Sequence, residues 1–337
     1  MNPELEHLTR LVAGGDEALV EAADAARRRW CGEPVHLRGI IEFSNVCERN
    51  CAYCGLRRDN TALRRYTMTA DRILEVVAGA VTRGVRTIVL QSGESDGTEP
   101  EALARLIAAI KRNADVALTL SVGVKSLDAY RTWRDAGADR FLLKHETANP
   151  ALYVTLHPDS RLSERLHALV NLKALGYQTG TGNIVGLPGQ TPEDLADDIL
   201  LTRDLDVDMA AFGPLVPHPG TPLADVPVAG IELALRVVAA ARLALGPVHI
   251  PATTAFDAVA PDGRERALRA GANVIMANLT PLDCRGLYEI YPSDRTANSI
   301  ERVQHILDRV GRPLATDHGH SLKRPAAAGV GKGGADD

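Results

Sequence analysis

Residues 35–54 read VHLRGIIEFSNVCERNCAYC, an apolar, β-rich run that passes directly into three cysteines. Cys47, Cys51 and Cys54 have the spacing C-x3-C-x2-C, and the three residues after Cys47 are polar. Cysteines clustered in a polar loop are usually kept for reactivity or for ligation and not for packing. The stretch therefore predicts a strand that leads, at its carboxyl end, into a ligand-binding loop.

Seven further β-rich runs follow this strand, and longer segments with helical periodicity alternate with them. The runs are 87–91, 116–121, 140–146, 179–187, 209–216, 248–254 and 273–279. The clearest helical patterns are 70–84, 101–113, 163–176 and 192–205. A strand-helix unit repeated eight times in about 250 residues predicts an α/β fold, a (β/α)8 barrel of the TIM type. An open, doubly wound sheet of eight strands is the alternative.

The chain divides by composition into three parts. Residues 1–34 contain helix formers with an apolar stripe and are expected to form an N-terminal helical extension over the bottom or a side of the barrel. Residues 35–320 hold the barrel pattern. Residues 321–337 are rich in Gly and Ala and have little apolar bulk to offset the entropy of ordering, so we expect a disordered tail.

Composition excludes several classes of function. The chain has 337 residues, 45% of them hydrophobic, and a formal net charge of -5, which gives no electrostatic footprint for nucleic acid. No apolar stretch approaches the roughly 20 residues of a membrane-spanning helix, and the N-terminus lacks the layout of a signal peptide. Five cysteines cannot all pair, which is unlike a secreted disulfide framework. We expect a cytoplasmic protein that binds small molecules, with no nucleic acid and no membrane partner.

Three clustered thiols limit the metal centres that the loop could hold. A structural zinc site normally uses four ligands, and no second cysteine pair is present. The four-cysteine iron-sulfur spacings also fail to match. The remaining interpretation is a cubane of four irons with three protein ligands, which leaves one iron open to an exogenous chelate.

The spacing, with Tyr53 immediately before the last cysteine, resembles the signature of the radical S-adenosylmethionine (SAM) superfamily. In that family the cluster loop follows the first barrel strand, where this loop also lies. The resemblance implies that Cys47, Cys51 and Cys54 bind a 4Fe-4S cluster. It also implies that SAM chelates the open iron before it is cleaved to a 5'-deoxyadenosyl radical.

Polar residues follow most of the other predicted strands, and in a barrel they would meet at one face. They are Ser92, Gly93 and Glu94; Thr119 and Ser121; Lys144, His145 and Glu146, with Arg165 in the next helix; the GLPGQT segment 186–191; His218; Thr253 and Thr254; and Tyr288 and Tyr291. Some have simpler interpretations. The 186–191 segment is also a turn with a helix cap at Thr191, His218 suits a rigid loop between prolines, and Cys31 and Cys284 are single thiols.

Seven longer stretches narrow the resemblance to the HydE family of FeFe-hydrogenase maturases, over residues 35–315. They are 41–60, 87–94, 145–150, 185–191, 217–224, 250–255 and 271–281. The resemblance implies that the cofactor is held by Tyr53, Ser92, Gly93, Glu94, Lys144, Glu146 and Arg165. It implies a substrate cavity lined by Thr119, Thr253, Thr254, Tyr288 and Tyr291.

The resemblance also implies a function. The radical would act on a small cysteine-derived or iron-cysteine substrate in FeFe-hydrogenase cofactor assembly. The implied partners are that small molecule, other hydrogenase maturases, and an electron donor such as ferredoxin or flavodoxin.

Two departures from the HydE pattern leave other functions open. Lys144 stands where the pattern usually has arginine, so a planar fork becomes a point charge. No cysteine follows Cys284, so we expect no accessory C-terminal cluster. The alternatives are a carbon-skeleton enzyme of the methylornithine synthase type, a HydE homologue with another small sulfur-containing substrate, and a non-catalytic iron-sulfur carrier.

Overall fold

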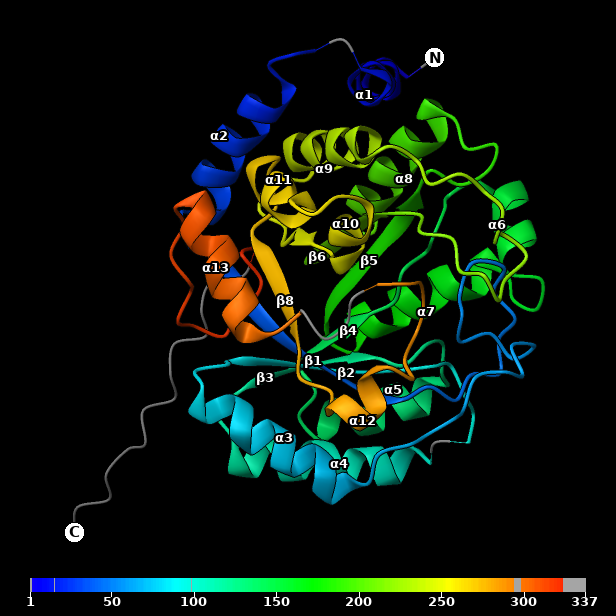
Figure 1. Cartoon of the computed structure of the whole chain (residues 1–337), viewed down its shortest axis with the longest axis vertical. Coiled ribbons are helices and arrows are strands. Elements are labelled where there is room, and N and C mark those ends of the chain that lie inside the picture. The colour runs from blue at the N-terminus through cyan, green and yellow to red at the C-terminus, as the bar shows by residue number, and fades with distance from the viewer. Residues whose placement is uncertain (1, 15, 98, 294–297, 324–337) are drawn as a thin grey trace.

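A computed structural model describes residues 2–14, 16–97, 99–293 and 298–323, and eight parallel strands form one sheet within it (Figure 1). The strands are β1 (His36–Ser44), β2 (Thr87–Ser92), β3 (Ala117–Ser121), β4 (Arg140–Leu142), β5 (Gln178–Val185), β6 (Met209–Pro214), β7 (Pro251–Ala252) and β8 (Val274–Asn278). Six of them fall within the predicted runs, and β2 and β5 each extend one residue beyond theirs. Their order, β6-β5-β4-β3-β2-β1-β8-β7, pairs chain neighbours except where β8 joins β1, as a barrel requires, and this excludes a doubly wound sheet.

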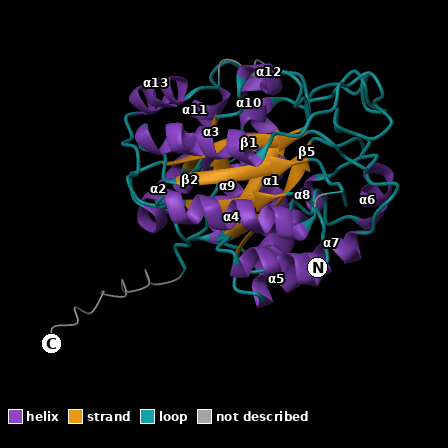
Figure 2. Cartoon of the chain, turned by 90° about the horizontal axis from the view of Figure 1, so that it is seen from below, coloured by secondary structure: helices purple, strands orange, loops and turns teal. Residues whose placement is uncertain are grey.

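Helices form a shell outside the sheet (Figure 2). They are α1 (Pro3–Ala13), α2 (Leu19–Cys31), α3 (Ala70–Thr82), α4 (Pro100–Asn113), α5 (Leu127–Asp135), α6 (Pro150–Leu156), α7 (Leu162–Ala174), α8 (Pro192–Asp204), α9 (Ile231–Leu245), α10 (Thr254–Val259), α11 (Gly263–Arg269), α12 (Leu282–Arg285) and α13 (Ile300–Val310). The sheet and this shell make the predicted (β/α)8 barrel.

The sheet closes between its edge strands β6 and β7 only at the amino end. There the amide of Ala210 donates to the carbonyl of His249 at 2.8 Å, and the amide of His249 donates to the carbonyl of Asp208 at 3.0 Å. Beyond this point β7 is two residues long and begins at Pro251, which has no N–H for a ladder. The barrel is therefore nearly closed, and it is open at the carboxyl ends of β6 and β7.

The pleat of β1 divides its side chains between two environments. Ile40 and Glu42 line the cavity inside the barrel, whereas Ile41 and Phe43 belong to the main hydrophobic core between sheet and helices. Alternation of this kind is the ordinary consequence of a two-residue strand period. Because β1 is almost wholly buried, the cysteine loop that follows it begins at a fixed position in the barrel.

The N-terminal helices cover one side of the barrel, where α1 packs on α8 and α9, and α2 packs on α9. The bottom is covered instead by the C-terminal segment 313–323. Its carbonyls at His318 and Gly319 accept hydrogen bonds from the fully buried Arg140 at 2.5 and 2.8 Å. Ser321 is buried against Asp208, so 321–323 packs on the barrel. The rest of the predicted disordered tail lies outside the described residues.

None of the helices in the described ranges is both long and apolar enough to span a lipid bilayer.

Gly182 in β5 is a position where the fold requires glycine. Its φ is 153°, and a Cβ atom there would lie 1.9 Å from the carbonyl oxygen of Ala211 on β6. We expect Gly182→Ala to push β5 and β6 apart and to lower the free energy of unfolding by about 2–3 kcal/mol. The measurement is urea denaturation followed by circular dichroism.

Gly79 supplies the matched control, because it is exposed on α3 and a Cβ atom there meets nothing within 4 Å. Gly79→Ala is expected to stabilise the protein by about 0.5–1 kcal/mol. Equal stability of the two alanine variants would show that β5 and β6 do not approach as closely as described.

Candidate active site at the carboxyl ends of the strands

A cavity of about 330 Å³ opens at the carboxyl ends of the strands. Nearly all of the residues that the sequence nominated line it, together with the three cysteines. They are Cys47, Cys51, Tyr53, Cys54, Ser92, Gly93, Glu94, Lys144, Glu146, Arg165, Thr253, Thr254, Tyr288 and Tyr291. Residues from opposite ends of the chain therefore meet in one site, as the barrel topology requires.

The cysteine loop is held to the barrel by the buried side-chain amide of Asn45 and the half-buried guanidinium of Arg65. The side chain of Asn45 accepts from the amide of Tyr66 at 2.7 Å and donates to the carbonyl of Leu287 at 2.8 Å. Arg65 donates to the carbonyls of Asn45 and Leu56, both at 2.7 Å. These charge-assisted bonds satisfy loop carbonyls that no strand or helix would satisfy, so the loop has one conformation.

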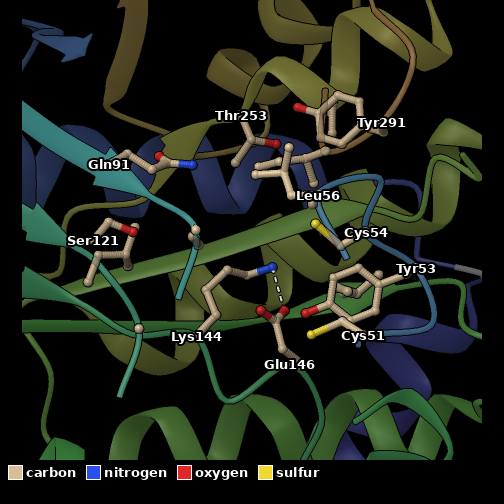
Figure 3. Close-up of a pocket in the computed structure, with 18 of the residues that line it drawn as sticks. Cys51, Tyr53, Cys54, Leu56, Gln91, Ser121, Lys144, Glu146, Thr253 and Tyr291 are labelled. Carbon is tan, nitrogen blue, oxygen red and sulfur yellow. Dashed lines mark ion pairs between the residues drawn. The ribbon is translucent and has the colours of Figure 1, made fainter. Parts of the chain in front are cut away.

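The three thiols lie close together at this loop. Burial, followed by the nearby Cys54 and Cys47, raises the pKa of Cys51 well above its ordinary value. Burial likewise raises the pKa of Cys47. Figure 3 shows Cys51 and Cys54 facing the cavity. Such thiols stay protonated until a metal displaces the proton, which is the behaviour of a ligand set.

Gly93 lets β2 approach the cysteine loop. A Cβ atom at Gly93 would lie 2.3 Å from the carbonyl oxygen of Val46 and 2.8 Å from the Cβ of Cys47. The amide of Gly93 also donates to the carbonyl of Ser44 at 3.0 Å. Gly93 therefore shapes the site through its missing side chain.

The arrangement of the three thiols indicates which kind of metal centre they could bind. Across the described residues, no three His, Cys, Asp or Glu side chains are placed to hold a single metal ion. A cubane differs, because each cysteine binds its own iron and the sulfurs need not converge on one point. Three partly buried thiols that lie close together without converging fit such a cluster.

The half of the cavity beside the cysteines is charged. Glu94 Oε1 accepts from Arg49 Nε at 2.6 Å, and its Oε2 lies 3.6 Å from Arg165 Nη1. Glu146 Oε2 lies 2.9 Å from Lys144 Nζ (Figure 3). Burial alone would raise the pKa of Glu146, but Lys144 and Arg165 outweigh it and lower that pKa. The Glu146 carboxylate is thus held ionised.

The segment after β4 alternates its side chains, as the strand period predicts. Lys144 and Glu146 face the cavity, whereas His145 is buried on the other side, with Nδ1 3.0 Å from Thr181 Oγ1 and Nε2 3.3 Å from Asp198 Oδ1. Glu146 has a φ of 70°, and its backbone bridges to Asn183 of β5. The buried Asp198 supports this strained turn by accepting from Asn183 Nδ2 at 2.5 Å.

The other half of the cavity is polar and uncharged apart from Glu42. Thr254 Oγ1 lies 2.6 Å from the hydroxyl of Tyr291, and Tyr288 is hydrogen-bonded to Gln91. Thr253 Oγ1 is buried and has no hydrogen-bond partner within the described ranges. A buried hydroxyl without a partner at a cavity wall is suited to a ligand.

Thr119 does not line the cavity. It shares a face of β3 with Ser121, which does, but it lies two residues deeper, where its buried hydroxyl is below the cavity floor. A substrate-binding role for Thr119 therefore stays a prediction from the sequence.

The side chains left open by the sequence lie outside the cavity. His218 is buried behind the cysteine loop, with Nδ1 accepting from the amide of Gly220 at 2.9 Å and Nε2 3.5 Å from Glu289. Cys284 is buried beside Arg72, and Cys31 ends α2. The cap at Thr191 is present.

Two residues of the site were missed from the sequence. Arg49 lies in the cysteine loop, where its position between Cys47 and Cys51 was a usable signal. His157 lies in the connection between α6 and α7, and its pKa falls to about 3 because it is buried and close to Arg165. No motif marks it, since only the tertiary fold brings this connection against the cysteine loop.

A nearly closed parallel barrel whose first strand leads into three partly buried, clustered cysteines defines a radical SAM enzyme, and residues 41–202 match the Radical SAM superfamily. Membership implies use of a 4Fe-4S cluster and SAM. The chain is 48% identical over 311 residues to the [FeFe] hydrogenase maturase subunit HydE of Thermotoga maritima (strain ATCC 43589 / DSM 3109 / JCM 10099 / NBRC 100826 / MSB8), a match that covers 91% of this chain and 89% of that one. The chain belongs to the HydE family of FeFe-hydrogenase maturases.

The chain also has more distant likenesses. A biotin synthase of Gloeothece citriformis (strain PCC 7424) is 28% identical over 79% of this chain and 77% of its own. The crystal structure of methylornithine synthase (PylB) superposes with a TM-score of 0.83 at 24% identity, covering 92% of this chain and 94% of that one. The latter likeness shows the fold.

The three loop cysteines are expected to be necessary for iron. In anaerobically reconstituted protein, Cys47→Ala, Cys51→Ala or Cys54→Ala should each abolish the full cluster, because a cubane that loses one of three protein ligands is no longer held. Cys31→Ala and Cys284→Ala are the controls and should retain about four irons per chain. Iron analysis and Mössbauer spectroscopy measure the outcome. A stable full cubane in any of the three loop variants would contradict the ligand assignment.

Acid should remove the stabilisation that Glu146 supplies. Its folded-state pKa is lowered, so its contribution is fully present above the ordinary value of 4.5 and is lost as the pH falls through the folded-state pKa. Wild type should be more stable than Glu146→Gln at pH 7, and the difference should shrink below about pH 4.5. Urea denaturation across this range measures it. A difference independent of pH would mean that the carboxylate is not ionised in the folded state.

Proposed function

We propose that Cys47, Cys51 and Cys54 hold a 4Fe-4S cluster with one open iron, where SAM binds. The 5'-deoxyadenosyl radical formed from SAM would act on a small cysteine-derived or iron-cysteine substrate in FeFe-hydrogenase cofactor assembly. One observation carries the proposal. A single cavity runs from the three thiols, past the charged residues, to the hydroxyl groups beside β7 and β8. Cluster, cofactor and substrate would therefore share one enclosed space.

The charged half of the cavity suits the amino-acid moiety of SAM. Three cations, Arg49, Lys144 and Arg165, face two carboxylates, Glu94 and Glu146, which leaves an excess of positive charge beside the cysteines. An incoming carboxylate group would neutralise that excess. Glu94 and Glu146 would accept hydrogen bonds from the ammonium group and the ribose hydroxyls. The ring of Tyr53, next to Cys54 at the cavity wall, is placed to contact the adenine.

Lys144 replaces the expected arginine without removing the charge. Its ammonium group already binds Glu146 at 2.9 Å, so it acts as a point charge that orients this carboxylate. Arg165, whose Nε donates to the carbonyl of Lys144 at 2.5 Å, still presents a planar fork to the cavity. Arg165 therefore keeps a second positive charge beside that of Lys144 at this end of the cavity.

The chemistry supplied by the bound groups is reductive cleavage of SAM to a 5'-deoxyadenosyl radical. The chain's own contribution is enclosure and orientation. Tyr288 is almost completely buried, and Leu56, Ile184 and Leu215 add apolar walls. Exclusion of water by these walls protects a reactive species from side reactions.

The substrate half of the cavity selects for a small polar molecule. The hydroxyl of Thr253 has no hydrogen-bond partner among the residues that the structure describes, and Thr254 and Tyr291 form a hydroxyl pair that can both donate and accept. The cavity volume of about 330 Å³ lies at the lower end for small-molecule sites. A thiol-derived amino acid or its iron complex fits this wall. Reduction of the cluster also requires an electron donor, for which ferredoxin or flavodoxin is suited, and other hydrogenase maturases would supply the substrate or receive the product.

Substrate specificity tests the proposal directly. Reduced enzyme should cleave SAM to 5'-deoxyadenosine and methionine, and a cysteine-bound iron dicarbonyl cyanide complex or a cysteine-derived thiazolidine should stimulate this turnover, whereas lysine should not. Thr254→Val should weaken the binding of the stimulating substrate about five-fold, which corresponds to one lost hydrogen bond of about 1 kcal/mol. Chromatography of the products measures both.

Thr82→Val is the matched control, because Thr82 is exposed on α3, away from the cavity. It should leave the stimulation unchanged. Conversion of lysine to methylornithine would replace the proposed substrate class with that of a carbon-skeleton enzyme. Inertness toward both kinds of substrate would leave the family assignment intact and remove the proposed substrate.

A further inference from the structure

His157 connects the cysteine loop to the wall of the cavity. Its Nδ1 lies 3.3 Å from Cys51 Sγ, and its Nε2 lies 3.4 Å from the hydroxyl of Tyr53. The imidazole is 2% exposed and stacks on Tyr153, with ring centroids 4.6 Å apart and planes 20° apart. One buried ring thus bridges a predicted cluster ligand and the aromatic residue beside another ligand.

The backbone on both sides of this bridge is fixed. The amide of Ala52, in the cysteine loop, donates to the carbonyl of Leu156 at 2.8 Å. The amide of Asn50 donates to Asp159 Oδ2 at 3.0 Å. The cysteine loop is therefore bonded to residues 156 and 159, which lie on either side of His157 in the chain. These bonds fix the backbone that places His157 beside Cys51.

The proton positions follow from the chemistry of the partners. A cysteine sulfur bound to iron is a thiolate and has no proton, so Nδ1–H of His157 must be the donor in their contact. In a neutral imidazole Nε2 then has a lone pair and can accept from the Tyr53 hydroxyl. The sequence Tyr53 O–H to His157 to Cys51 is a relay in which each member donates to the next.

We infer that His157 is a positioning residue of the cluster, which donates a hydrogen bond to Cys51 Sγ and thereby raises the reduction potential of the 4Fe-4S cluster bound there. This rests on the proposed ligand set. Reduction adds negative charge that spreads onto the sulfurs, and a donor to sulfur stabilises the reduced form more than the oxidised form. The burial of His157 strengthens the effect, because water does not compete for the sulfur.

Tyr53 acquires a second role from the same geometry. Beyond the contact of its ring with the cofactor, its hydroxyl selects the imidazole tautomer that has a proton on Nδ1. Loss of the hydroxyl leaves the ring of His157 in place and removes that selection. Tyr53→Phe should therefore shift the potential in the same direction as loss of the imidazole, by a smaller amount.

The test is anaerobic reconstitution of the full-length protein without SAM, followed by potentiometric titration monitored by EPR. His157→Leu removes the donor and should shift the midpoint potential to a more negative value. His157→Asn can place an amide N–H near the position of Nδ1 and should restore most of the wild-type potential. His167→Leu makes the same change at an exposed histidine of α7 and should shift nothing.

Pulsed EPR after exchange into D2O gives a second measurement. Wild type should show an exchangeable proton coupled to the cluster that His157→Leu lacks. The inference is wrong if His157→Leu, with its full iron content, retains the wild-type potential and the coupled proton. If His157→Leu holds no cluster, the potentials of Tyr53→Phe and His157→Asn test the inference instead. A wild-type potential in Tyr53→Phe together with a shifted potential in His157→Asn would overturn the inference. A wild type without a cluster would contradict the ligand set itself, a separate failure.

Discussion

The two backbone hydrogen bonds that join β6 to the residues before β7 determine where this barrel can have a cavity. They close the sheet at its amino end, at Ala210 and His249. Toward the carboxyl ends, β7 pairs with β8 and not with β6. Two edge strands that separate toward their carboxyl ends leave room between β6 and β7 for a ligand. The wall that carries Thr253 and Thr254 exists because Pro251 ends the ladder there.

The electrostatics of the cavity depend on Arg165. Its side chain is buried between Glu94 and Glu146, and these carboxylates raise its pKa although burial opposes this. Each charged side chain in the half of the cavity beside the cysteines has an oppositely charged partner in the protein. A charged cofactor that binds there would therefore exchange one ion pair for another. Preorganised charges of this kind need little rearrangement when a ligand binds. Removal of Arg165 would leave two carboxylates with less compensation in a buried space, which is costly.

The eight strands and the cysteine loop were predictable because their signals are local. Apolar runs such as Thr87–Ser92, with their flanking helical periodicity, specify a parallel sheet, and a barrel places their carboxyl ends together. Depth within the barrel was not predictable, because Thr119 and Ser121 have the same strand face and differ only in layer. His157 has no local signal, since its neighbour Cys51 is more than a hundred residues away.

The C-terminal segment that covers the bottom of the barrel has a consequence for biosynthesis. Arg140 lies near the middle of the chain, but the carbonyls that satisfy its guanidinium belong to His318 and Gly319. During translation this cation must stay hydrated, because burial without acceptors is expensive. The barrel floor can therefore be sealed only after residues 318 and 319 have been synthesised. A nascent chain that stops before these residues would expose an unsealed barrel to cellular quality control.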